Sequence, residues 1–300
     1  MSCTDGASLR LAYVNEATWG QTPASPSMKE LRKLAGSGLV LERDAAQSAE
    51  ISLDRQRKCF RFGEQKITGT LDGELAYGIY DDLIEAGLMG TWASNVLKAG
   101  ADRHSFTIEQ SYTSISGKYE VFTGVMVDQV DFEFQTGEMA KVSFSLLGRG
   151  ITVNASELGA PAAAATTCAY SPAEITIYDG ATVLEAASAK ITVANNLEAS
   201  YKLGSNDAAC VVPGMADITG EVVVAFKDYT LFEKFTGETP VALKVVLDGA
   251  NGDYEFMLPN CKFTSAEKPA PDTGPIVLTL QFTALYNATE GTALKITRIP

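Results

Sequence analysis

Val125-Met126-Val127-Asp128-Gln129-Val130-Asp131-Phe132-Glu133-Phe134 carries the clearest structural signal in this chain. In its second half, Val130, Phe132 and Phe134 would lie on one side of an extended backbone and Asp131 and Glu133 on the other. Such alternation predicts a half-buried antiparallel strand. After the turn Thr136-Gly137-Glu138 the pattern returns over 141–146, so residues 125–146 are predicted to form a β-hairpin.

Further alternating runs predict strands in the second half of the chain, at 174–178, 183–184, 221–226, 241–247, 254–258 and 276–282. Glycine turns separate two pairs of these runs, at Asp179-Gly180 and at Asp248-Gly249-Ala250-Asn251-Gly252. The chain is therefore predicted to be mainly β.

Three short motifs occur twice and in the same order. Each half has an Ile-Thr-Gly strand, a short helix followed by a glycine, and a Gly-x-Tyr-Glu hairpin. Their positions are 67–69, 80–87 and 117–120 in the first half, and 218–220, 229–237 and 252–255 in the second. Half a chain is too long a period for a solenoid, whose units have roughly 20–50 residues. We therefore predict a duplicated domain, an α+β arrangement dominated by sheet with one short flanking helix in each copy.

Composition changes along the chain suggest domain boundaries. We predict an N-terminal arm and loop over 1–40, a first β domain over 41–150, a glycine- and alanine-rich linker over 151–170 and a second β domain over 171–300. An ordered N-terminal strand is the alternative for the first segment. Relative to the second domain, the first holds an insertion, Thr91–Arg103, and insertions of this size belong in loops.

The 300 residues are 46% hydrophobic and 20% charged, which is typical of a globular protein with a core. The net charge of −13 argues against a nucleic-acid-binding surface, because such a surface needs clustered Lys and Arg. One basic cluster alternates with two phenylalanines and predicts a solvated or intersubunit strand face: Arg55, Arg57, Lys58 and Arg61 with Phe60 and Phe62.

The cysteines are odd in number and widely spaced, which argues against a disulfide framework or a zinc site. We expect free, mostly buried thiols at all five positions: Cys3, Cys59, Cys168, Cys210 and Cys261. Residues 9–14 are too short a run for the apolar region of a signal peptide, so none is expected, and no window reaches the roughly 18 apolar residues of a membrane helix. A soluble protein made in the cytoplasm, without membrane contact, is expected.

The sequence offers no catalytic or cofactor-binding constellation. The one histidine, His104, is expected to be a surface or packing residue, and no nucleophile elbow, phosphate loop or dinucleotide fingerprint is present. Asp81, Asp82 and, in the second half, Asp228 lie at predicted helix starts, where carboxylates favour the positive helix end. We predict capping for them, and no enzyme, metal or cofactor.

Arg10-Leu11-Ala12-Tyr13-Val14-Asn15-Glu16-Ala17-Thr18-Trp19-Gly20 resembles the N-terminal segment of major tail tube proteins of long, flexible-tailed bacteriophages. Such segments read as a strand, E-x-x-W/F-G and a proline. The order that follows is similar as well, and the resemblance covers most of the chain. It implies β-sandwich or barrel-forming domains with a flanking helix, whose inner sheets close into a ring. The rings stack into a tail tube.

Two tube-like halves in one chain would give a homotrimeric ring with pseudo-six-fold symmetry. Ring closure would also pair the open edges of the inner sheets. The resemblance implies a structural virion protein that is made in the host cytoplasm and contacts copies of itself, a tape measure protein and tail tip or terminator proteins. DNA would pass through the lumen during genome ejection without specific binding.

A lumen that passes DNA should not attract phosphates, so acidic side chains opposite the core are its candidates. We assign Asp131, Glu133 and, in the second copy, Glu221 to the lumen, with outer solvent or a neighbouring subunit as the alternative. For contacts between stacked rings we expect the N-terminal arm with Trp19 and the insertion with Trp92, because ring closure provides no axial contact.

Two other classes of function remain open. One is a β-sandwich capsid decoration or adhesion module, which would stay a small oligomer instead of forming rods. The other is a carbohydrate-active enzyme that stacks sugars on Trp19 and Trp92, for which no carboxylate pair is identifiable. An outer-membrane barrel is disfavoured by the missing signal peptide and the lack of regular lipid-facing strands.

Overall fold

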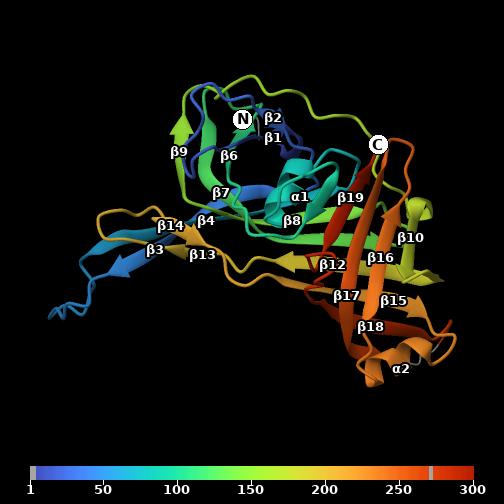
Figure 1. Cartoon of the computed structure of the whole chain (residues 1–300). Coiled ribbons are helices and arrows are strands. Elements are labelled where there is room, and N and C mark those ends of the chain that lie inside the picture. Colours follow the sequence, from blue (N-terminus) through green and yellow to red (C-terminus); the bar gives the residue numbers. More distant parts are fainter. Residues whose placement is uncertain (1–4, 270–272) are drawn as a thin grey trace.

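The computed structural model describes residues 5–269 and 273–300 (Figure 1). A long antiparallel sheet crosses the molecule in the order β3–β4–β8–β7–β12–β15–β18–β17. In that order the strands are β3 (Gly38–Gln47), β4 (Phe60–Glu74), β8 (Lys141–Gly148), β7 (Tyr119–Gln135), β12 (Ala186–Ala194), β15 (Asp217–Ala225), β18 (Val277–Ala284) and β17 (Asp253–Glu267).

Two smaller antiparallel sheets pack against the long sheet. The first cover sheet has the order β2–β1–β6–β7–β9, with β2 (Lys29–Glu30), β1 (Leu9–Asn15), β6 (Phe106–Tyr112) and β9 (Gly150–Asn154). The second cover sheet has the order β11–β10–β16–β17–β19–β5, with β11 (Thr182–Leu184), β10 (Ile175–Asp179), β16 (Val241–Leu247), β19 (Lys295–Ile299) and β5 (Val96–Lys98).

Strands β7 and β17 each belong to two layers. The N-terminal half of β7 pairs with β6 and β9, and its C-terminal half pairs with β8 and β12. Likewise, β17 pairs first with β16 and β19 and then with β18. In both strands a bulge, at Asp128 and at Thr264, shifts the register in the second half. A bulge bends a strand and increases its twist, which helps one strand to pass from one layer to the other.

The helices differ in their surroundings. Helix α1 (Asp81–Gly87) lies in the middle of the molecule with Leu83, Ile84 and Ala86 buried. Helix α2 (Thr230–Thr236) lies at the far end of the long sheet (Figure 1) and has no buried residue. The remaining elements are the 3-10 turns η1 (Gly6–Ser8) and η2 (Pro172–Glu174), and a separate hairpin of β13 (Glu198–Ser200) and β14 (Cys210–Val212).

One continuous hydrophobic core lies between the long sheet and the cover sheets and includes residues from both halves of the chain. Phe132 of β7 and Phe256 of β17 meet in it with ring centroids 4.8 Å apart. Apolar side chains alternate inward along both strands, so each strand supplies one face to this core.

The mainly β fold with one short helix in each half is confirmed, as is the hairpin of β7 and β8. The strand pairings of the two halves follow the same order, but no closed barrel occurs among the described residues. Strand β1 is the ordered strand considered as the alternative for the N-terminal segment, and β9 begins where the linker was expected. The division into domains stays a prediction.

Candidate assembly surfaces

The side of the long sheet that faces away from the core is polar. Along six adjacent strands, buried apolar side chains alternate with partly exposed polar ones. The polar set comprises Thr68, Thr70 and Asp72 on β4, Ser143 and Ser145 on β8, Gln129, Asp131 and Glu133 on β7, Lys190 and Thr192 on β12, Thr219 and Glu221 on β15, and Thr279, Gln281 and Thr283 on β18. We call this surface the polar face. It brings Asp131, Glu133 and Glu221 onto one side of one sheet.

Lys190 lies among these three carboxylates, an arrangement that the sequence did not predict. Its Nζ lies 2.7 Å from Glu133 Oε1 and 3.4 Å from Asp131 Oδ1, and its residue pairs with Glu221 on the neighbouring strand. The hydrogen bond to Glu133 and the nearby charge of Asp131 raise the pKa of Lys190. The acidic residues are therefore partly neutralised, and the polar face is mostly hydroxyl and amide groups.

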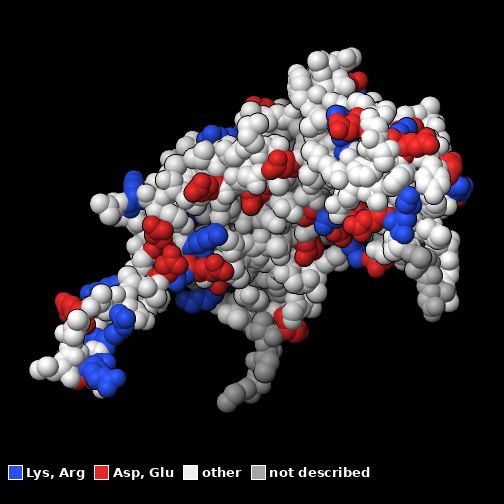
Figure 2. All heavy atoms as spheres, turned by 90° about the horizontal axis from the view of Figure 1, so that it is seen from below, with Lys and Arg blue, Asp and Glu red and all other residues white. Residues whose placement is uncertain are grey.

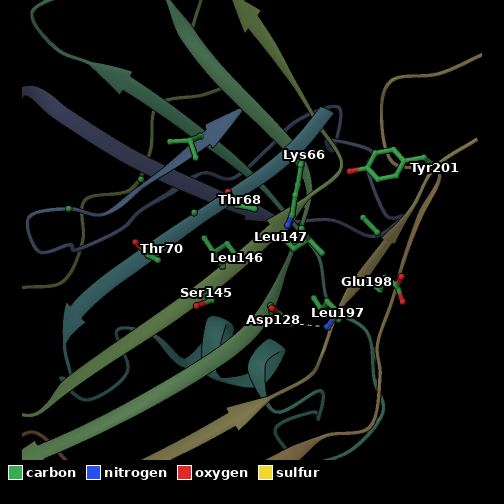
Figure 3. Close-up of a pocket in the computed structure, with 15 residues that line it drawn as sticks. Lys66, Thr68, Thr70, Asp128, Ser145, Leu146, Leu147, Leu197, Glu198 and Tyr201 are labelled. Atoms are coloured by element: carbon green, nitrogen blue, oxygen red, sulfur yellow. Dashed lines mark hydrogen bonds between the residues drawn. The ribbon is translucent and has the colours of Figure 1, made fainter. Parts of the chain in front are cut away.

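A groove of about 670 Å³ borders one end of the polar face (Figure 3). Thr68, Thr70 and Ser145 line it from the long sheet, and Glu198 and Tyr201 from the hairpin β13–β14. The Asp128 carboxylate accepts a hydrogen bond of 2.7 Å from the backbone N–H of Leu197 and Tyr201 bonds the Gln65 carbonyl. These bonds attach a loop of the second half to the sheet of the first.

Both outer edges of the long sheet lack a partner strand in the described chain, although the Leu39 N–H on β3 donates to Gln110 Oε1 at 3.0 Å. Strand β3 pairs with β4 alone, and residues 262–267 of β17 pair with β18 alone. Val40 and Leu41 on β3 are 54% and 38% exposed. An unpaired strand edge with exposed apolar side chains is a template for pairing with another chain.

The middle of the long sheet contains a junction between the two halves. There β7 pairs with β12: Gln129 lies opposite Ala194 at one end of the pairing, and Gln135 lies opposite Ser188 at the other. The core side of this junction is fully buried, with Val130 at 0% and Val193 at 1% exposure. Strand β12 is alanine-rich and was not predicted, since small side chains alternate too weakly to indicate a strand.

Strands β3 and β4 continue beyond the long sheet as a projecting hairpin (Figure 1). We call residues 42–66 the arm. Its tip exposes Ile51 and Leu53 completely, and Phe60 and Phe62 by about half. The arm contains six basic and five acidic residues, a net charge of +1 (6 − 5), whereas the net charge of the whole chain is −13. Figure 2 shows the basic side chains gathered on this projection. Arg55, Arg57 and Lys58 are exposed in the loop at the tip and Arg61 is on β4, so the cluster is solvated but does not form the expected strand face.

The insertion Thr91–Arg103 contributes to the second cover sheet. Its strand β5 pairs with β19, with Val96 opposite Thr297 and Lys98 opposite Lys295. Trp92 is half-buried, with the Arg298 guanidinium 4.0 Å from its ring centroid and its Nε1 3.2 Å from the Asp81 carbonyl oxygen. The insertion thus connects the two halves within one chain, which loop placement from sequence could not show.

Trp19 is also half-buried by its own chain. Its Nε1 donates to the Gly124 carbonyl oxygen at 3.1 Å, and the Arg149 guanidinium lies 5.4 Å from its ring centroid. Glu16 organises this loop by accepting hydrogen bonds from the backbone N–H of Gly20 at 2.6 Å and of Gly124 at 2.9 Å. That Trp19 and Trp92 contact a neighbouring ring stays a prediction.

The acidic residues at the helix starts behave differently from one another. Asp81 and Asp82 lie in the first turn of α1 without capping it: Asp81 binds Tyr254 and Arg298, and Asp82 binds Tyr13 and Lys29. The capping prediction is wrong for this pair, because charged partners from neighbouring strands compete successfully. Asp228 does accept a hydrogen bond of 2.9 Å from the Thr230 N–H, which lowers the Asp228 pKa.

The expectation of mostly buried cysteines is wrong. Cys59, Cys168 and Cys210 are free and exposed because they lie on the arm, in the segment 151–170 predicted as a linker, and on hairpin β13–β14. Cys261 is buried, and burial raises its pKa to about 12. Cys3 lies outside the described residues.

The lone histidine has a structural contact. His104 Nε2 lies 2.7 Å from the Gly90 carbonyl oxygen. Within residues 5–269 and 273–300, no group of three or more His, Cys, Asp or Glu side chains is placed to hold a metal ion. The same residues contain no helix with the length and apolarity needed to span a membrane.

Comparison with known proteins gives one family. The sequence model described as phage tail tube protein matches residues 6–284. The match includes the Glu16–Gly20 loop, both Ile-Thr-Gly strands and the whole long sheet. No curated protein matches the chain.

Proposed function

The chain belongs to the phage tail tube protein family, and we propose that three copies join edge to edge into a ring whose stacking makes a DNA conduit. Membership makes the chain a structural component of a phage tail. The trimer, the stacking and the passage of DNA are our proposals. A catalytic role is not part of them.

The two open edges of the long sheet are the observation that carries the ring. Joining unlike edges, β3 of one copy to β17 of the next, is a heterologous contact, and such contacts close into rings when the rotation between copies allows. Closure removes every open edge of the long sheet, which is the usual protection against uncontrolled edge pairing.

Recurrence of the pairing order supports three copies in each ring. The first half has β1·β6, β6·β7, β7·β9, β3·β4, β4·β8 and β7·β8, and the second has β10·β16, β16·β17, β17·β19, β12·β15, β15·β18 and β17·β18. We interpret this as a duplicated domain. Each chain would then occupy two of six equivalent positions.

The polar face would line the lumen of this ring. Asp131, Glu133 and Glu221 supply negative charge there, and Lys190 balances part of it. Since DNA binding by proteins depends mainly on cations that contact phosphates, a surface of hydroxyls, amides and compensated charges lets the duplex slide.

The arm would supply most of the contact between stacked rings. Strands tilt relative to the axis of a closed barrel, so a hairpin that overruns the sheet leaves the ring at its rim. Exposed apolar side chains and local positive charge suit contact with another, acidic copy. Trp19 and Trp92 would add less, because their own chain covers most of each side chain.

Other partners follow from the place of a tube in a phage tail. We propose a tape measure protein inside the lumen and tail tip and terminator proteins at the two ends, with synthesis in the host cytoplasm. Ring ends would present the same surfaces that stacked rings present to one another.

Electron microscopy of the purified chain tests the proposed function. We expect rods whose end-on averages show three-fold symmetry with six similar lobes. A capsid decoration or adhesion module would stay a small oligomer without stacking, and an end-on average with six chains per ring would contradict the trimer.

A further inference from the structure

The junction between β7 and β12 is a template for the contact between copies. In a contact of this kind, β17 of one copy would correspond to β7, and β3 of the next copy to β12. On β8, Phe144 pairs with Val130, two residues beyond the bulge at Asp128. On β18, Leu280 pairs with Ala266, two residues beyond the bulge at Thr264. Ala266 therefore holds the place of Val130.

Strand β3 corresponds in the same way to β12. Leu39 pairs with Gly69, and Ile191 pairs with Gly220, the glycines of the two Ile-Thr-Gly strands. Two residues further along, Leu41 holds the place of Val193. Val193 is 1% exposed and Leu41 38%, so the isolated chain leaves open an apolar position that the template buries.

Resting on the ring proposed above, we propose that β3 of one copy pairs antiparallel with Ser265–Lys268 of the next copy, in the register of the β7–β12 junction. Leu41 then lies opposite Ala266 on the core side. Val40 lies opposite Glu267 on the polar face, as Thr192 lies opposite Asp131 within the chain.

The template also indicates what covers helix α2. Asn195, directly after β12, donates from Nδ2 to the carbonyl oxygens of Gly87 at 2.9 Å and Val127 at 3.0 Å, and so satisfies the C-terminal end of α1. Arg43 follows Glu42 on β3 and holds the place of Asn195. At the junction between copies, its guanidinium would reach the C-terminal carbonyls of α2.

Physical chemistry favours this placement of Arg43. The last carbonyl groups of a helix lack intrahelical donors, and a cation near them is favourable. In the isolated chain Arg43 donates to Gln65 Oε1 at 3.1 Å and stacks on Phe62, both on the arm. Gly237 at the end of α2 is exposed, whereas its counterpart Gly87, whose carbonyl oxygen accepts from Asn195, is buried. The neighbouring copy would supply the cover that α2 lacks.

Cysteine pairs test the register. The background variant replaces Cys3, Cys59, Cys168 and Cys210 with serine and keeps the buried Cys261. Into it we introduce Leu41→Cys with Ala266→Cys, or Val40→Cys with Glu267→Cys, because directly opposite side chains are close enough for a disulfide. Val40→Cys with Ala266→Cys is the control, since these side chains lie on opposite faces. Asp131→Cys with Thr192→Cys should give the same bond within one chain.

We expect oxidation of assembled rings to give covalent trimers from both matched pairs and little product from the control. Rings that form normally but link only through the control pair would overturn this register while leaving the tail tube function intact. Absence of rings from the background variant and from the wild type would overturn both.

Arg43 gives an independent measurement. Because a charge-assisted hydrogen bond is stronger than a neutral one, Arg43→Ala should weaken ring formation about tenfold, and Arg43→Lys should weaken it less. Arg61→Ala on the arm is the matched control. Equal effects of Arg43→Ala and Arg61→Ala on ring formation would overturn the assignment of Arg43 to α2.

Discussion

At the scale of single residues, the Glu16-x-x-Trp19-Gly20 motif is a structural clamp. Besides the two backbone N–H groups, the Glu16 carboxylate accepts hydrogen bonds from the hydroxyls of Ser105 at 2.7 Å and Thr107 at 2.8 Å. One carboxylate therefore joins the N-terminal loop, β6 and β7. Gly20, at the end of the motif, has φ +72°, which favours glycine. The Arg149 side chain lies directly against it, where a Cβ would be.

Removing this carboxylate should destabilise the fold. Glu16→Ala leaves four donors without their acceptor, and we expect the free energy of unfolding to fall by about 2 kcal/mol in a urea titration. Glu50→Ala, at an exposed position on the arm, should change it by less than about 0.5 kcal/mol. Equal values for the two variants would contradict the clamp.

Lys190 determines how the lumen assignment should be tested. Replacing Asp131 and Glu133 with lysine would place three cations together at the β7–β12 junction, so loss of assembly would say nothing about the lumen. Thr70 and Gln281 are exposed on the same polar face and belong to different halves. They offer a cleaner substitution.

We expect Thr70→Lys with Gln281→Lys to assemble into normal tubes and to slow DNA ejection about tenfold, because repeated phosphate contacts accumulate along the tube. Raising the salt concentration should restore the rate. The control variant, Thr70→Gln with Gln281→Glu, changes the same two positions without adding a cation. Unchanged ejection from the lysine variant would place the polar face on the outside.

At the scale of elements, the arm of residues 42–66 is a further candidate for contact between rings, beside the insertion that the sequence suggested. The insertion carries β5, which pairs within the chain, whereas the arm projects with its apolar side chains in solvent. Strand pairing satisfies the backbone of β5 internally. The strands of the arm pair with each other, but its apolar side chains have no cover in the described chain, so the arm is our candidate for contact between rings.

Shortening the arm should separate ring closure from stacking. If residues 49–58 are replaced by Asn-Gly, a turn that suits a two-residue hairpin loop, we expect rings in electron micrographs but few long tubes. The variant Arg55→Glu with Arg57→Glu keeps the length and should shorten tubes mainly at low salt. Normal tubes from the shortened arm would favour stacking through Trp19 and Trp92 instead.

At the scale of the whole molecule, one core serves both halves. Phe256 of the second half is fully buried, and its ring lies against Phe132 and Phe134 of the first. Strand β12, the insertion and hairpin β13–β14 all cross between the halves. Such shared packing predicts that the halves unfold together.

We therefore expect a single unfolding transition for the monomeric chain, and Phe256→Ala should lower its stability by about 4 kcal/mol through the cavity that it leaves. Calorimetry checks both points. Phe60→Ala, on the exposed arm, should have an effect below about 1 kcal/mol. Two transitions, of which only one responds to Phe256→Ala, would indicate independent domains over 41–150 and 171–300.

Local sequence determined both helices and the strands with clear alternation, but not the short strand β5 or the alanine-rich strand β12. Alternation over Val130–Phe134 specified the side that faces the core, and Gly137, at φ +87°, allowed the following turn. The same alternation was enough to place Asp131, Glu133 and Glu221 on the side of the sheet that faces away from the core, because it separates the two faces of a strand.

Only the tertiary structure decided which strands meet. The pairing of β7 with β12, the position of Lys190 among the carboxylates and the open edges at β3 and β17 depend on contacts between residues far apart in the chain. Local periodicity contains no information on such partners. They are selected when apolar faces from several strands are buried together, since that burial, and no single residue, supplies most of the free energy of folding.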